Sequence, residues 1–351
     1  MDLAVLPPVK PMLATLAREL PMGDYSYEPK WDGFRCLAFR HGSEVDLRSR
    51  NGSPFSRYFP ELVAAFEALP APPCVIDGEI LVTTNGHFNF DALLKRIHPA
   101  ASHVTAMAES APASFLAFDV LAIGNTTLTP SPFVDRRRRL EAVMATAGPP
   151  LFVTPLTDDV DVARRWLEQP AEAVDGVVAK HHDSPYLSGK RAMVKVKPLH
   201  TADCVVAGCR IAADRSGVSS LMLGLYGDEG LLHHVGVAAG FGKDRRIELV
   251  EAVRPHVVDL PDHPWRCGFA LEGGSMGRLA GSAGRWTPDM PLDWVPLRPE
   301  LVCETTYDQV DGLRWRHPGG FVRWRPDRDA ASCRIDQLVV KDRPLPLTAT
   351  T

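Results

Sequence analysis

The sequence lacks the features of membrane proteins, of secreted proteins and of proteins stabilised by a structural zinc site. It contains no run of about 18 consecutive apolar residues, so a membrane-spanning helix is not expected. Its N-terminus shows no basic segment followed by an apolar one, so no secretion signal is predicted. Seven cysteines never come closer than five residues apart, which gives neither a zinc knuckle nor a disulfide framework. These absences predict a cytoplasmic protein with reduced thiols.

Positive charge is also scarce for a protein that would bind nucleic acid. The formal net charge is −4, whereas a domain that binds phosphates usually carries a basic surplus. Any DNA-binding surface must therefore be local. Lysine is rare, because only 9 of the 39 basic residues are lysine, so a lysine suggests a position that needs an amine. Four of the nine lie in the segments singled out below: Lys30, Lys180, Lys195 and Lys197.

The 351 residues are enough for two or three domains of ordinary size. The first fifteen or so are rich in proline and are predicted to run along the surface. Beyond them, short β-prone runs at residues 25–39 and 74–82 mix with amphipathic helical patterns at residues 90–97, 135–145 and 161–169. This mixture predicts an α+β first domain with antiparallel sheets, at residues 1–198.

After Pro198 the pattern changes to short strands separated by turn residues. Five strand-like runs and one helical pattern are the number expected for an oligonucleotide-binding (OB) barrel. The strands are predicted at residues 204–210, 221–226, 231–237, 301–310 and 321–325, and the helix at residues 244–253. An OB-fold β-barrel is therefore predicted for residues 199–351.

The segment at residues 28–35, Glu-Pro-Lys-Trp-Asp-Gly-Phe-Arg, carries the strongest chemical pattern. Lys30 is followed by Asp-Gly and then Arg, which puts an amine on a tight turn beside a carboxylate and a guanidinium. A lysine of ordinary pKa is protonated at pH 7, and nearby cations or partial burial lower that pKa and make the amine a nucleophile. Taken alone, the same string would also fit a surface turn.

Polar groups at unusual places elsewhere strengthen this interpretation. Asp77 and Glu79 interrupt an apolar run, where burying a charge is costly unless it has a function. Lys195 and Lys197 alternate with valines, so on a strand both amines point to one face. Two cations beside a nucleophilic lysine suit the α-phosphate of a nucleotide, because they would neutralise the charge that develops there. Three other segments also place a charged residue at an unusual position: Arg50 in a turn, Asp119 beside Phe118, and an apolar run bounded by Asp175 and Lys180.

In order and approximate spacing, these segments resemble the nucleotidyltransferase motifs of ATP-dependent DNA ligases. The resemblance continues at residues 323–328, Arg-Trp-Arg-Pro-Asp-Arg, which are similar to the last motif of that superfamily. It runs from about residue 10 to 340 and is closest to the small two-domain bacterial enzymes of the ligase C group, associated with repair and end joining. It implies an ATP-grasp-like adenylyltransferase domain followed by the OB fold.

The resemblance also implies roles for the residues of these motifs. Lys30 would form a phosphoramide with AMP, with ATP as the donor and magnesium or manganese as the divalent ion. Glu28 would accept a hydrogen bond from the adenine amino group, which guanine could not supply. The other implied nucleotide-binding residues are Arg35 and Arg50 near the ribose and phosphates, Glu79 at the ribose hydroxyl, Phe118 stacked on adenine, and Lys180.

The remaining implied roles concern phosphates and metal. Lys195 and Lys197 would bind phosphates, Glu79 and Asp175 would serve the metal, and Arg325, Asp327 and Arg328 would orient the pyrophosphate leaving group. Two positions depart from the usual motifs. Asp175 replaces a glutamate and is shorter by one methylene, and Arg328 replaces a lysine, which keeps the charge but changes its geometry.

Two other patterns are given structural interpretations. The four consecutive arginines at residues 136–139 are predicted to form a solvated helix face, with a DNA contact as the alternative. The adjacent pairs His181-His182 and His233-His234 are not predicted to bind metal, because neighbouring residues on a strand face opposite ways.

The implied function is the sealing of nicks that carry a 5′-phosphate and a 3′-hydroxyl in double-stranded DNA during repair. The protein is expected to act as a monomer, with end-joining or base-excision repair proteins as possible partners. Two alternatives remain open. One is an RNA ligase or a capping-type guanylyltransferase of the same superfamily, and the other is a catalytically idle nucleic-acid-binding protein.

Overall fold

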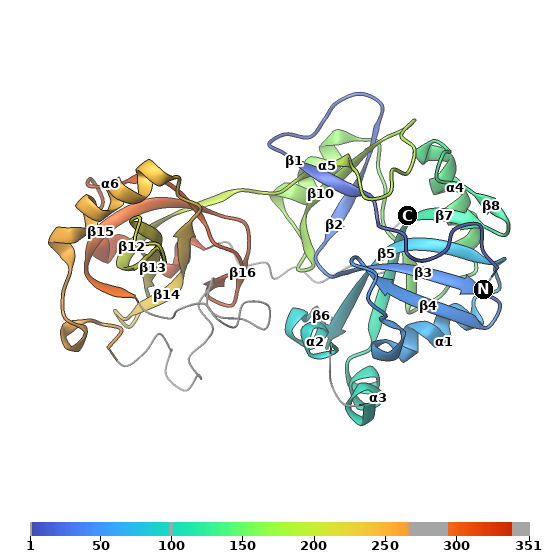
Figure 1. The fold of residues 1–351 in the computed structure, drawn as a ribbon, viewed down its shortest axis with the longest axis horizontal. Coiled ribbons are helices and arrows are strands. Elements are labelled where there is room, and N and C mark those ends of the chain that lie inside the picture. The colour runs from blue at the N-terminus through green and yellow to red at the C-terminus, as the bar shows by residue number, and fades with distance from the viewer. Residues whose placement is uncertain (1, 98–100, 267–293, 339–351) are drawn as a thin grey trace. The chain divides into compact units, whose positions relative to one another are not determined.

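The structure is a computed structural model that describes residues 2–97, 101–266 and 294–338. The chain divides into two compact units, the first ending at Pro198 and the second beginning at Leu199. Figure 1 shows the first unit in blue to green and the second in yellow to red. No helix among the described residues is long and apolar enough to cross a membrane.

The described residues of unit 1 form two sheets and five α-helices. The smaller sheet has the order β1 (Leu13–Ala17), β11 (Arg191–Val196), β10 (Val174–His181) and β2 (Tyr25–Trp31). The larger sheet has the order β4 (Glu44–Ser49), β3 (Phe34–His41), β5 (Cys74–Thr84), β7 (Ala113–Ile123) and β8 (Thr126–Thr127), with β6 (His87–Phe88) and β9 (Leu151–Val153) attached. The helices are α1 (Pro60–Ala68), α2 (Phe90–Lys95), α3 (Ala101–Ser110), α4 (Phe133–Met144) and α5 (Val160–Glu168).

Most strand pairs of unit 1 are antiparallel, and among its described strands β1 with β11 and β7 with β9 run parallel. The predicted α+β class is therefore confirmed. Strands β5 and β7 are buried over almost their whole length, as their continuous apolar sequences indicate. Gly78 lies between the two carboxylates of β5. The position requires glycine, because a Cβ atom there would lie 2.3 Å from the Phe115 ring.

The N-terminal segment runs along the surface, as predicted, and a few buried residues anchor it. Leu6 is exposed, whereas Leu3 and Met12 are buried in a cluster that includes Leu37 and Phe39. Strand β1 follows directly and pairs with β11. The segment is therefore attached to the core near both of its ends, and it ends beside the strand that carries Lys195.

The four arginines of α4 do not form a single solvated face. Arg136 and Arg137 are buried, whereas Arg138 and Arg139 are exposed. Arg136 donates two hydrogen bonds to Asp119, at 2.8 and 2.9 Å, and two to backbone carbonyls. Because each of the three nitrogens of its guanidinium donates a hydrogen bond, its burial is tolerated. The predicted solvated face is correct for one half of the run and wrong for the other.

Within the part of unit 2 that the structure describes, five strands form a barrel with the order β14 (Leu232–Ala239), β13 (Val218–Tyr226), β12 (His200–Ile211), β15 (Val295–Tyr307) and β18 (Gly320–Trp324). Gly319 closes it, since its N–H donates to Val237 and its carbonyl accepts from Ala239. Helix α6 (Lys243–Val253) lies between β14 and β15 in the chain, and the hairpin of β16 (Val310–Asp311) and β17 (Arg314–Trp315) precedes β18. The OB-fold prediction is confirmed.

His234 of β14 makes the stability of unit 2 sensitive to acid. Its imidazole is buried, which lowers its pKa to about 3, and the charges of Arg314 and Arg210 act in the same direction. The unfolded chain takes up a proton at this histidine below about pH 6.5, whereas the folded chain does so only near pH 3. The unfolded state binds more protons between these values, so acidification favours unfolding.

We therefore expect the free energy of unfolding to fall by up to about 1.4 kcal/mol per pH unit between about pH 6 and pH 4 on account of His234. Urea unfolding of wild type and His234→Gln at several pH values would measure this. The variant should lose less stability over the same range. Parallel losses in the two proteins would contradict the role given to His234.

Candidate active site

A pocket in unit 1 brings together eight of the residues predicted to bind the nucleotide and its phosphates. Strands of both sheets line it, among them β2, β3, β5, β7, β10 and β11. The predicted residues in its wall are Glu28, Lys30, Arg35, Arg50, Glu79, Phe118, Lys180 and Lys195. These positions are up to 167 residues apart in the chain, as Glu28 and Lys195 show, and the two sheets make them neighbours.

Lys30 shares a carboxylate with a second lysine. The Lys30 Nζ lies 2.7 Å from Asp175 Oδ1, and the Lys197 Nζ lies 2.9 Å from Asp175 Oδ2. Asp175 is buried, and the two ammonium groups offset the cost of burying its charge. The resemblance assigned Asp175 to the metal alone, but the structure also makes it the group that positions the candidate nucleophile.

The turn after Lys30 requires glycine for a reason of space. A Cβ atom on Gly33 would lie 2.2 Å from the Ile80 carbonyl oxygen of β5. The backbone N–H of Gly33 also donates to Glu79 Oε1 at 3.2 Å. This close approach brings the end of β2 against β5, and it places Lys30 on the same wall as Glu79.

Burial and charge alter two titrating groups in the pocket. Burial raises the pKa of Glu79 to about 7, although the charges of Arg35 and Lys30 act against this rise. Burial also lowers the pKa of Lys195, and repulsion from Lys30 and Lys197 lowers it further. Perturbed pKa values are common at functional sites, where charges are collected for a purpose.

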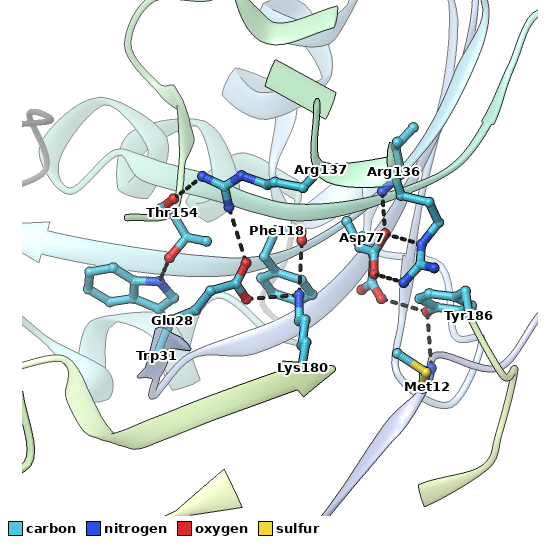
Figure 2. A network of polar contacts seen from close by, with 12 residues as sticks. Met12, Glu28, Trp31, Asp77, Phe118, Arg136, Arg137, Thr154, Lys180 and Tyr186 are labelled. Carbon is cyan, nitrogen blue, oxygen red and sulfur yellow. Dashed lines mark hydrogen bonds and ion pairs between the residues drawn. The ribbon is translucent and has the colours of Figure 1, made fainter. Parts of the chain in front are cut away.

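Arg35 is held by a residue to which the sequence analysis gave no role. Its guanidinium donates to both oxygens of Asp77, each at 2.6 Å, and Tyr186 donates its hydroxyl to the same carboxylate. Figure 2 shows Asp77 and Tyr186 in this network, next to Met12. The Arg35 guanidinium also lies over the Phe118 ring, 4.4 Å from its centre. Arg35 therefore supports the aromatic wall of the pocket as well as lining it.

Glu28 is the most firmly held carboxylate of the pocket. Its Oε2 lies 2.8 Å from Lys180 Nζ, and its Oε1 accepts a hydrogen bond of 3.1 Å from Arg137. Figure 2 shows these two cations reaching Glu28 from β10 and from α4. The Lys180 ammonium also donates to the Phe118 carbonyl at 2.9 Å. Sequence reasoning missed Arg137, because its arginine run resembles a solvated helix face.

A second hollow adjoins the first and is lined by some of the same residues. The two share Lys30, Arg35, Arg50 and Glu79, and the second adds Phe34 and Asn51 among others. Arg50 is exposed on the rim of both. An exposed guanidinium beside the pocket is suited to a phosphate group.

The three predicted residues of unit 2 form a cluster with Asp203. Arg325 donates to both oxygens of Asp203, at 2.8 and 2.9 Å, and to Asp327 at 2.9 Å. The Arg328 Nε lies 3.6 Å from Asp203 as well. Hydrogen bonding from Arg325 lowers the pKa of Asp327 to about 2. Asp203 was missed in the sequence, where it lies more than a hundred residues before its partners.

The carboxylates of unit 1 are compatible with a magnesium ion. No group of three or more metal-binding side chains occurs among the described residues. Magnesium, however, commonly takes only one or two protein carboxylates and completes its shell with phosphate oxygens and water. Glu79 and Asp175 both lie near Lys30, as their interactions with it show. They fit a metal that arrives with a nucleotide.

An α+β domain with a lysine-bearing pocket, followed in the chain by an OB barrel, is the architecture of the nucleotidyltransferases that include the ligases. Residues 10–197 match the family described as "ATP dependent DNA ligase domain", and residues 214–328 match "ATP dependent DNA ligase C terminal region". The chain belongs to the family of ATP-dependent DNA ligases.

Several known proteins are similar to this chain. DNA ligase C2 of Mycolicibacterium smegmatis is 48% identical over 341 residues, which cover 96% of each chain. DNA ligase C of Mycobacterium tuberculosis is 46% identical, covering 98% of this chain and 97% of the other. A solved structure described as "DNA binding with a minimal scaffold: Structure-function analysis of Lig E DNA ligases" has a TM-score of 0.53 at 16% identity, over 90% of this chain and 99% of that one. This last likeness concerns the fold alone.

Proposed function

We propose that the protein seals nicks in double-stranded DNA through a lysyl-AMP intermediate on Lys30. The observation that carries this proposal is the position of Lys30 in a pocket wall that also contains Lys180 and Lys195, with its amine held by Asp175, which Lys197 contacts as well. The similarity to proteins named DNA ligase extends over almost the whole chain and supports DNA as the substrate. RNA ligation or guanylyl transfer would need a different substrate in the same site.

In the first step the Lys30 amine attacks the α-phosphorus of ATP. A phosphorus–nitrogen bond forms, the bond to the bridging β-phosphate oxygen breaks, and pyrophosphate leaves with the electron pair. Asp175, 2.7 Å from the amine, is in position to accept the proton that Lys30 loses. Lys195 and Lys197 supply positive charge beside the phosphoryl oxygens, which become more negative as the pentavalent transition state forms. A bound magnesium or manganese ion, held by Glu79 and Asp175, would further neutralise the phosphates.

The two later steps use the same pocket. The 5′-phosphate of the nick attacks the phosphorus of lysyl-AMP, and the Lys30 amine leaves. The neighbouring 3′-hydroxyl then attacks the 5′-phosphate, and AMP leaves as the strand is joined. Arg50, exposed on the rim shared by both hollows, is placed for contact with the 5′-phosphate. In unit 2 we propose that Arg325, Asp327 and Arg328 orient pyrophosphate during the first step.

Incubation of the purified protein with radiolabelled ATP, GTP or NAD tests the donor. A labelled band on a denaturing gel should form with ATP and a divalent ion. A band with GTP would indicate the capping-type alternative, and no band with any donor would indicate an idle binding protein. Sealing of nicked DNA and nicked RNA duplexes, compared at equal concentration, tests the substrate. Faster joining of RNA would contradict the proposal.

The state of the cysteines bears on the cellular compartment. All six described cysteines are unbridged, which supports a reducing compartment such as the cytoplasm. We propose that the enzyme acts there as a monomer in DNA repair, alongside end-joining or base-excision repair proteins. Co-purification from cells with damaged DNA would test for such partners.

Sealing should depend steeply on salt. The net charge of −4 means that DNA binding rests on a few local cations. Each phosphate contact contributes a slope of about −0.9 to the logarithm of affinity against the logarithm of salt concentration. At limiting DNA we expect sealing to fall sharply between about 50 and 200 mM sodium chloride, while adduct formation with ATP in the partly enclosed pocket changes less. Sealing that is insensitive to salt would contradict this description of the DNA-binding surface.

A further inference from the structure

Arg137 has a position that the reaction described above leaves unexplained. It does not line the pocket, yet it is buried directly behind Glu28, which does. Each of its nitrogens has a different partner. Nη1 donates to Glu28, Nη2 donates to the Thr154 carbonyl at 2.7 Å, and Nε donates to Glu141 at 2.7 Å. Three partners in different directions fix the plane of the guanidinium.

Thr154 links Arg137 to the segment that carries the nucleophile. Its carbonyl accepts from Arg137, and its hydroxyl accepts a hydrogen bond of 2.7 Å from the indole nitrogen of Trp31. Trp31 is the neighbour of Lys30 in the chain. The same residue therefore holds both the guanidinium and β2, on which Glu28 lies two residues before Lys30 (Figure 2).

The second cation on Glu28 connects the carboxylate to the aromatic wall. Lys180 contacts Glu28 Oε2 at 2.8 Å and the Phe118 carbonyl at 2.9 Å. Its ammonium also lies 4.9 Å from the centre of the Phe118 ring. The Glu28 carboxylate and the Phe118 ring are consequently fixed relative to each other. A base stacked on that ring would present its edge to a carboxylate of defined orientation.

Lys180 and Arg137 differ in how precisely each can orient the Glu28 carboxylate. The Lys180 ammonium ends a flexible stem and acts as a point charge, whereas the Arg137 guanidinium is planar and donates along fixed directions. A carboxylate only accepts hydrogen bonds, so it favours the 6-amino group of adenine over the 6-carbonyl group of guanine. That selection depends on the angle at which the carboxylate meets the base, because hydrogen bonds weaken steeply away from linearity.

We propose that Arg137 is a positioning residue that sets the preference for adenine by fixing the orientation of Glu28. The proposal rests on the function proposed above, in which Glu28 accepts from adenine. Arg137 acts through Glu28 and leaves the phosphates and the nucleophile untouched. Its loss should therefore weaken recognition of the amino group, beyond any general loss of activity.

Two nucleotides and one matched pair of variants test this. Purine ribonucleoside triphosphate carries a hydrogen in place of the 6-amino group of ATP. Arg137→Lys keeps the positive charge but removes the planar guanidinium and its fixed donor directions. Arg136→Lys is the matched control. Arg136 lies on the same helix and is equally buried, but it binds Asp119 in place of Glu28. The kcat/KM of adduct formation is measured with both nucleotides for each protein, and the ratio between them is compared.

We expect wild type to prefer ATP by about tenfold or more, the value of one hydrogen bond to a charged group. The ratio should fall towards one in Arg137→Lys and stay at the wild-type value in Arg136→Lys, even if both variants are slower. An unchanged ratio in Arg137→Lys would overturn the proposal, because a structural role slows both nucleotides alike. So would a ratio near one in wild type that forms the ATP adduct normally. Failure of wild type to form any adduct would instead refute the proposed function.

A second variant keeps the test valid if Arg137→Lys does not fold. Glu141 is half exposed, and its carboxylate holds the Arg137 Nε. Glu141→Gln removes the negative charge and so weakens the interaction with Arg137 Nε, while the buried residues of unit 1 stay unchanged. We expect it to reduce the ratio by about twofold, in the same direction as Arg137→Lys. A ratio equal to that of wild type in this folded variant would contradict the proposal.

Discussion

Lys30→Ala should reduce the labelled enzyme–AMP adduct to background. The alanine removes the amine that Asp175 holds at 2.7 Å. Two of the three neighbouring amines have other partners, since Lys180 is bound to Glu28 and Lys197 to Asp175, and neither can reach the α-phosphorus without breaking a buried ion pair. The third, Lys195 on β11, is proposed to bind the phosphate and not to attack it. The measurement is adduct formation with radiolabelled ATP, followed on a denaturing gel.

Two controls separate this result from a failure to fold. The Lys30→Ala protein should still join a nick that is already adenylylated, because that step needs no lysine nucleophile. Lys190→Ala removes an exposed lysine outside the pocket wall and should form a normal adduct. A normal adduct in Lys30→Ala would mean that another residue carries AMP.

Arg325→Ala and Arg328→Ala should damage adduct formation far more than the joining of adenylylated nicks. Pyrophosphate is present only in the first step, and these guanidiniums are the groups proposed to orient it. Each lost charge-assisted hydrogen bond costs about 1.5–3 kcal/mol, which corresponds to a ten- to hundredfold slower first step. Single-turnover rates of both steps, measured on each variant, give the comparison.

Arg323→Ala is the matched control for this pair. Arg323 lies on β18, two residues before Arg325, but it is more exposed and is bound to Glu304 outside the Asp203 cluster. Its removal should change the first step by less than about threefold, as expected for an exposed ion pair. If the Arg325 and Arg328 variants lost both steps equally, the cluster would serve the fold of unit 2 and not the leaving group.

The sequence predicts the architecture well where local pattern decides it. The five barrel strands and α6 are all found at their predicted places in the chain, most of them within a few residues, because turn residues bound each of them. Strands β12 and β15 begin earlier than predicted, at His200 and Val295. Residues 200–203 pair with β15 although three of the four are polar. The helices α1 and α3 carried no prediction. Tertiary contacts stabilise both, since α1 packs against β4 and β7 and α3 packs against α1.

The candidate site was predictable only in part. Glu79 and Lys195 are marked by charge inside apolar runs, and Lys30 by the Asp-Gly and Arg that follow it, and both are local signals. Arg137 and Asp203 carry no such signal, because their roles come from partners more than a hundred residues away. The arginine run of α4 was misleading for the same reason. Whether a helical arginine faces solvent or a buried carboxylate depends on which sheet the helix covers.

The buried arginines also affect how fast the protein meets DNA. Arg40, Arg96, Arg136 and Arg137 lie inside unit 1 and cannot contact a phosphate. The net charge of the whole chain, with these arginines included, is −4, which gives no long-range attraction to a polyanion. Association should therefore proceed near the unsteered rate of about 10⁵–10⁶ M⁻¹s⁻¹, well below that of electrostatically guided pairs. Lower salt would then lengthen the lifetime of the complex with DNA more than it speeds the encounter.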